Sequence, residues 1–141
     1  MRLTLLFIAL PTLAAAWEFS PTPICTLSHA EAGAELVITH DPGRQEYRLD
    51  VTRPGAWAAS PTFGMAFQGG RGFSIGTDRH AIAGDTLTVR DSGFGNVLYG
   101  LEYNASAAAF TASQFVEVSL DGAAEPVRQF RDCAARPPAT S

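Results

Sequence analysis

The sequence contains no lysine, because all ten of its basic residues are arginine. A phosphate-binding Walker loop, a pyridoxal-phosphate Schiff base and the Ser-x-x-Lys acylases each require a lysine. The composition therefore excludes all three of these chemistries.

Positive charge is also scarce relative to negative charge. Nine arginines and fourteen acidic residues follow residue 16, which gives that part of the chain a net charge of −5 when histidine is neutral. Binding to nucleic acid or to anionic lipid needs clustered positive charge. We therefore expect no nucleic acid and no anionic membrane surface among the partners.

Long apolar runs are missing except at the start of the chain, where Leu3 to Leu10 contains only one polar residue. This run is too short to span a bilayer, which needs about twenty apolar residues. Arg2 precedes it, and Pro11 and the Ala14-Ala15-Ala16 triplet follow, in the order typical of a secretory signal peptide. We predict a signal peptide over 1–16, a periplasmic or secreted mature chain from Trp17, and no stable membrane insertion after cleavage. The alternative is a buried N-terminal helix or strand of a cytosolic fold.

Cysteine occurs only twice, as Cys25 and Cys133, near the two ends of the predicted mature chain. In an oxidising compartment such a pair indicates a disulfide. The alternatives are metal ligation and a redox pair, although Cys-x-x-Cys spacing is absent. A disulfide would clamp the first strand to the C-terminal segment and stabilise the fold by up to about 4–5 kcal/mol through loop-closure entropy.

Short runs of alternating apolar and polar residues fill most of the remaining chain, and this period of two indicates strands. The clearest pair, around 36–38 and 47–51, is joined by Asp41-Pro42-Gly43, which predicts a hairpin. Further strands are predicted around 63–67, 73–77, 86–90 and 116–120.

Helical spacing of apolar residues occurs in two segments only, at 94–101 and after Asp121-Gly122, and the second would carry Cys133. The predicted fold class is therefore mainly β: a β-sandwich or partly open barrel with one or two short helices and one disulfide. We expect a single domain over 17–135 and a disordered tail over 136–141.

Catalytic motifs are also lacking. Ser74, Asp78 and His80 are the residue types of a hydrolase triad, but no Gly-x-Ser-x-Gly elbow accompanies them. Asp78 is typical of a turn. We therefore assign no catalytic residue.

Metal and cofactor motifs are absent as well. His29 and His40 match no zinc-ligand spacing and are expected at the surface. We expect no metal and no cofactor.

Four residues remain as candidates for a binding site: Trp57, Asp78, His80 and Tyr99. Trp57 stands in a loop between proline and glycine on one side and proline on the other, a setting in which an aromatic ring can anchor a ligand or partner. The alternative is that its ring folds back over one end of the barrel.

A family resemblance is confined to the C-terminal part. The segment Val118-Ser119-Leu120-Asp121-Gly122-Ala123-Ala124, ending in Phe130-Arg131-Asp132-Cys133, resembles the close of small secreted proteobacterial domains of the invasion-associated locus B type. In those domains a strand ending in Ser-Leu-x-Gly leads into a short helix. The resemblance covers about sixteen of the 141 residues and implies a bacterial periplasmic β-sandwich with a non-enzymatic role.

The function favoured by the sequence is that of a non-catalytic periplasmic or secreted binding or envelope-accessory domain, whose partner is a protein or an envelope ligand. One alternative is a periplasmic inhibitor of a hydrolase such as lysozyme, with Ser92-Gly93 and Tyr99 on the binding loop. The other is a small hydrolase that uses Ser74, His80 and Asp78.

Overall fold

A computed structural model describes residue 4 and residues 16–136 of the chain. Most of the predicted signal peptide and nearly all of the predicted tail lie outside the described residues. The described part forms ten strands and two helices in this order: β1 (Glu18–Ser20), β2 (Cys25–Glu31), β3 (Ala34–Asp41), β4 (Glu46–Thr52), β5 (Phe63–Gln68), β6 (Phe73–Thr77), β7 (His80–Ala83), β8 (Thr86–Asp91), α1 (Gly95–Glu102), β9 (Ser106–Phe110), β10 (Phe115–Ser119) and α2 (Ala124–Ala135).

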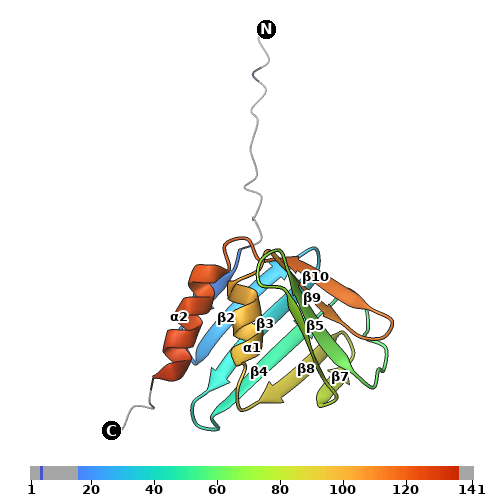
Figure 1. The fold of residues 1–141 in the computed structure, drawn as a ribbon, viewed down its shortest axis with the longest axis horizontal. Coiled ribbons are helices and arrows are strands. Elements are labelled where there is room, and N and C mark those ends of the chain that lie inside the picture. The colour runs from blue at the N-terminus through green and yellow to red at the C-terminus, as the bar shows by residue number, and fades with distance from the viewer. Residues whose placement is uncertain (1–3, 5–15, 137–141) are drawn as a thin grey trace.

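The strands form two antiparallel sheets, which confirms the predicted fold class. The larger sheet has the order β1-β2-β3-β4-β8-β7 and the smaller has the order β10-β9-β5-β6. The smaller sheet covers one part of the inner face of the larger sheet, and the two helices cover the other part (Figure 1). The architecture is therefore an open sandwich completed by helices.

Alternation along the strands places one set of side chains in the core. In the predicted hairpin of β3 and β4, Leu36 pairs with Val51 and Ile38 with Leu49, and all four are buried. Their neighbours in sequence, such as Arg48 and Asp50, point to the outer face, where the Arg48 Nε donates to the Asp50 carboxylate at 2.9 Å. One buried and one solvated face is the usual pattern of an antiparallel sheet.

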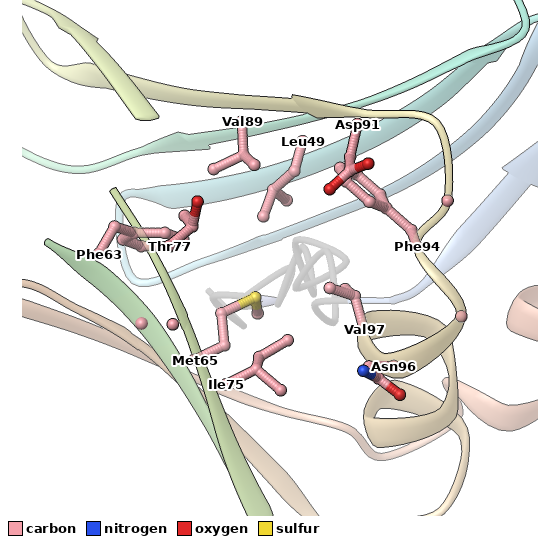
Figure 2. Close-up of a pocket in the computed structure, with 14 residues that line it drawn as sticks. Leu49, Phe63, Met65, Ile75, Thr77, Val89, Asp91, Phe94, Asn96 and Val97 are labelled. Carbon is pink, nitrogen blue, oxygen red and sulfur yellow. The ribbon is translucent and has the colours of Figure 1, made fainter. Parts of the chain in front are cut away.

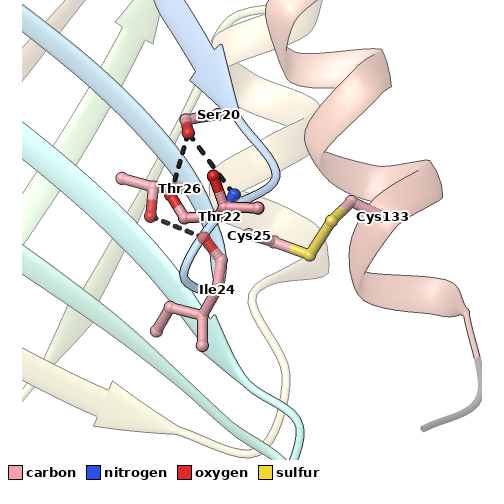
Figure 3. Close-up of a disulfide and its surroundings, with 6 residues drawn as sticks. All are labelled: Ser20, Thr22, Ile24, Cys25, Thr26 and Cys133. Carbon is pink, nitrogen blue, oxygen red and sulfur yellow. Dashed lines mark hydrogen bonds between the residues drawn. A yellow bond between two sulfur atoms is a disulfide. The ribbon is translucent and has the colours of Figure 1, made fainter. Parts of the chain in front are cut away.

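The predicted disulfide is confirmed. Cys25 at the start of β2 is bonded to Cys133 in α2, with the two Cα atoms 6.0 Å apart (Figure 3). The bond holds α2 against the edge of the larger sheet, where Val127 and Phe130 of the helix are fully buried. A disulfide of this kind is typical of proteins from oxidising compartments.

The structure corrects the prediction that His29 lies at the surface. His29 stands in β2 opposite Leu36 and is only 3% exposed. Its ring stacks on the Trp17 indole with the ring centres 4.5 Å apart, and its Nε2 lies 3.7 Å from a carboxylate oxygen of Glu31. The prediction was wrong because position 29 belongs to the inward set of a strand, which its neighbours in sequence do not reveal.

None of the helices in the described part of the chain has the length and apolar character needed to cross a membrane.

Candidate functional site

A cleft of about 540 Å³ opens between the two sheets and is closed at one end by the beginning of α1 (Figure 2). Strands β4 and β8 of the larger sheet form one wall, and β5 and β6 of the smaller sheet form the other. The residues that line the cleft are Leu49, Phe63, Gly64, Met65, Ile75, Gly76, Thr77, Val89, Asp91, Gly93, Phe94, Gly95, Asn96 and Val97.

The walls are apolar because they are built from the inward set of each strand. Met65 of β5 pairs with Ile75 of β6, and both side chains border the cleft from one side (Figure 2). Leu49 of β4 pairs with Val89 of β8, and this pair borders it from the other. Ile75 and Val89 are only half-buried, so apolar surface of both sheets remains open to solvent.

The polar side chains that line the cleft are Thr77, Asp91 and Asn96 (Figure 2). Asp91, the last residue of β8, accepts a hydrogen bond from the Ser92 backbone N–H at 2.7 Å. Its other carboxylate oxygen lies 3.5 Å from an Arg79 guanidinium nitrogen, and the Arg79 side chain is 75% exposed. An exposed ion pair of this kind contributes at most about 1 kcal/mol. Asp91 is therefore held by a contact that a ligand group can replace.

Trp57 does not reach this cleft or the surface. Its indole is 4% exposed, and the indole N–H donates to the Val51 carbonyl at 3.0 Å. The Arg53 guanidinium lies over the ring, 5.6 Å from its centre. The ring therefore folds back onto the core and is not an exposed anchor for a ligand or partner.

Asp78 and His80 flank the corner where the chain passes from the smaller to the larger sheet. Asp78 is exposed, whereas the His80 Nε2 lies 2.9 Å from the Ser60 carbonyl and is engaged with it. Ser74 stands on the exposed outer face of β6, opposite Ala66. No hydrogen bond joins Ser74 to His80 among the residues that the structure describes.

Tyr99 lies on α1 near the other end of β6, within a cluster of aromatic rings and one arginine. The Arg71 guanidinium donates to the Tyr99 hydroxyl at 2.9 Å and lies over the Tyr103 ring, 4.8 Å from its centre. The neighbouring Glu102 carboxylate, as a hydrogen-bond acceptor and as a negative charge, raises the pKa of the Tyr103 phenol. The four predicted binding residues thus occupy three separate places. Trp57 lies in the core, Asp78 and His80 lie at one end of β6, and Tyr99 lies near the other end.

The cleft itself was not predicted from the sequence. Its walls were predicted as inward-facing strand residues, since Met65, Ile75, Leu49 and Val89 all belong to alternating runs. Nothing in a single run distinguishes a residue packed in a closed core from one that borders an open cleft. The only local signal is Gly93-Phe94-Gly95, where a Cβ atom built at either glycine would meet no other atom within 4 Å, while Phe94 between them is buried.

Comparison with models of known protein families, with curated proteins and with solved structures gave no match in any of the three. Function is therefore argued from the residues and geometry of this chain alone.

Proposed function

We propose that this chain is a non-catalytic, exported binding domain that takes apolar groups of its ligand between its two sheets. The observation that carries the proposal is the open cleft of about 540 Å³ whose walls are apolar side chains of both sheets. Ligand sites in proteins are typically concave, about 300–1,000 Å³ in volume and mostly apolar, with few polar groups. The cleft has this size and this chemistry, with Thr77, Asp91 and Asn96 as the polar side chains that line it.

A binding role fits these residues better than hydrolysis does. A serine hydrolase needs its nucleophile and its base within hydrogen-bond reach, facing the same substrate. Ser74 faces outward from the smaller sheet, while the ring of His80 belongs to the larger sheet and is engaged by the Ser60 carbonyl.

Export is part of the same proposal. It is supported by the Cys25–Cys133 disulfide and by the order of charged, apolar and small residues at 1–16. The test is the intact mass and N-terminal sequence of the chain expressed in a bacterial host with a periplasm. We expect periplasmic material that begins at Trp17; material that still begins at Met1 would contradict export.

The ligand class is tested by calorimetric titration with alkanols of increasing chain length. Each buried methylene contributes about 0.8 kcal/mol, so octanol should bind roughly fifteenfold more weakly than decanol. Val89→Phe places a larger side chain in the cleft and should weaken the binding of decanol. The matched control is Val37→Phe, which adds the same volume on the outer face of the larger sheet and should leave binding unchanged. Equal affinities for both alcohols, or equal loss in both variants, would refute the proposal.

A second candidate function is inhibition of a hydrolase such as lysozyme, favoured by the exposed cluster around Arg71. Tyrosine and arginine are enriched among residues that dominate binding energy at interfaces. Tyr103 is 41% exposed, and the Arg71 guanidinium rests on its ring. Pull-down with lysozymes and proteases tests this role: Arg71→Ala should weaken any complex, and no complex at micromolar concentration excludes it.

A further inference from the structure

Strand β6 (Phe73–Thr77) is an unprotected edge of the smaller sheet. It pairs with β5 on one side, and no other strand in the described part of the chain pairs with it on the other. Its sequence, Phe-Ser-Ile-Gly-Thr, contains neither a charged residue nor a proline. Natural edge strands are usually protected by such residues, because free backbone N–H and C=O groups can pair with another chain.

The same strand forms a border of the cleft. Ile75, Gly76 and Thr77 all line it, so a strand added to the free edge of β6 would lie across the opening between the two sheets. Side chains of a strand point alternately to its two faces. Every second side chain of the added strand would therefore enter the apolar space beside Met65 and Val89, and the others would face solvent.

Charges of opposite sign stand at the two ends of β6. Arg71 precedes the strand, and its guanidinium, which is charged at any ordinary pH, donates to the Tyr99 hydroxyl. Asp78 follows the strand, and Arg79 and Asp91 near it add one charge of each sign. The C-terminal end of β6 therefore carries a net negative charge, and Arg71 stands at its N-terminal end.

We propose that the occupant of the cleft is an extended segment of a partner protein, which adds to β6 as an antiparallel strand. The antiparallel direction places the beginning of the segment beside Asp78 and its end beside Arg71. The segment is basic at its start, acidic at its end, and alternates apolar and polar residues between. This inference rests on the proposed function, since it identifies the ligand of the same cleft.

Two other occupants of the β6 edge can be compared with this one. The chain before residue 17 joins the molecule at the far edge of the smaller sheet, because the Trp17 indole N–H donates to the Ser119 carbonyl of β10. Strands β9 and β5 separate β10 from β6, a distance of roughly 14 Å. A second copy of the chain would pair β6 with β6, and the dependence of β6 exchange on protein concentration distinguishes it from a partner segment.

The probe is the capped peptide Lys-Thr-Val-Thr-Ile-Thr-Val-Glu, titrated calorimetrically into the chain beginning at Trp17. Amide hydrogen exchange of β6 is followed by NMR in the same samples. The free-edge amides of β6 should exchange at least about tenfold more slowly with the peptide bound, because they gain hydrogen-bond partners. Decanol should occupy the cleft without slowing them.

Matched peptides separate strand addition from simple apolar binding. The same residues in the order Lys-Thr-Thr-Thr-Val-Val-Ile-Glu lose the alternation and should bind about tenfold more weakly or worse. Exchange of the terminal Lys and Glu should weaken binding roughly two- to tenfold. One peptide is N-methylated at its three apolar residues and a second at its three threonines. Their dissociation constants should differ by more than about tenfold, because only one of the two patterns removes the N–H groups that face β6.

The outcomes distinguish the inference from the function on which it rests. Binding of decanol together with unchanged β6 exchange in the presence of peptide overturns strand addition and leaves the cleft function standing. Failure of both ligands overturns both. Slow amide exchange of β6 without peptide would overturn the proposal that a partner segment covers this edge. If the slow exchange depends on protein concentration, a second copy of the chain covers the edge. If it depends on the presence of residues 1–16, the chain's own N-terminal segment covers it.

Discussion

At the scale of single residues, Trp57 illustrates what a sequence pattern leaves undecided. Its setting between glycine and proline predicts a loop, and residues 53–62 form that loop. The direction of the ring depends on contacts with distant residues: the Trp57 backbone N–H donates to the Gly84 carbonyl at 2.9 Å and the indole N–H donates to Val51. Val51 belongs to β4 and Gly84 to the turn between β7 and β8, so the burial of Trp57 could not be derived from the residues beside it.

Replacement of Trp57 should therefore affect stability and not ligand recognition. Trp57→Ala should lower the free energy of unfolding by about 3–5 kcal/mol, because it empties a large buried site. Trp57→Phe should cost less, since it retains most of the ring and loses the hydrogen bond to Val51. Urea unfolding measures both values. A variant of normal stability that no longer binds ligand would show that Trp57 contacts the ligand after all.

At the scale of elements, strands were predicted where large apolar residues alternate and were missed where small residues do. Strand β9, with the sequence Ser-Ala-Ala-Ala-Phe, was not predicted, because alanine has a low strand propensity. Ala107 and Ala109 are nevertheless almost fully buried between β5 and β10. The need for small side chains at this position comes from packing between layers, which no local pattern reveals.

Helix α1 provides a test of how closely the layers pack. A Cβ atom at Gly100 would lie 2.5 Å from the ring of Phe67, which is only 1% exposed. Overpacking costs about 1–3 kcal/mol, whereas alanine in place of glycine gains about 1 kcal/mol of helix propensity. Gly100→Ala should therefore lower the free energy of unfolding by up to about 2 kcal/mol.

The control lies in the same helix. At Gly95 a Cβ atom would meet no other atom within 4 Å, so Gly95→Ala should be neutral or stabilising by up to about 1 kcal/mol. Chemical denaturation of both variants gives the comparison. Equal effects at the two positions would show that contact with Phe67 does not decide the choice of glycine at 100.

At the scale of the whole molecule, the disulfide could be predicted from the two cysteines and from the export signal expected over 1–16, and export itself stays a prediction. The cleft could not be predicted, because it depends on how far the two sheets diverge beyond β6 and β8. That separation is set by the packing of α1 and of the loop before it between the sheets. Residues far apart in sequence decide it together.

The disulfide closes a loop between residues 108 positions apart. Replacement of both Cys25 and Cys133 by serine should lower the free energy of unfolding by up to about 4–5 kcal/mol. Decanol binding by the folded variant should not change, because neither cysteine lines the cleft. Urea unfolding and calorimetry measure the two effects. A loss below about 1 kcal/mol would mean that α2 holds its place without the bond.

Binding of an apolar ligand between the sheets is tested most directly at Met65, whose side chain borders the cleft (Figure 2). The sequence has two methionines, Met1 and Met65, so the chain beginning at Trp17 gives a single signal when its methionine methyl group is labelled with carbon-13. Titration with decanol should shift this signal in a saturable manner, and in Val89→Phe the shift should need a higher decanol concentration. A signal that stays in place while decanol saturates the protein would show that the ligand binds elsewhere and that the cleft is not the binding site.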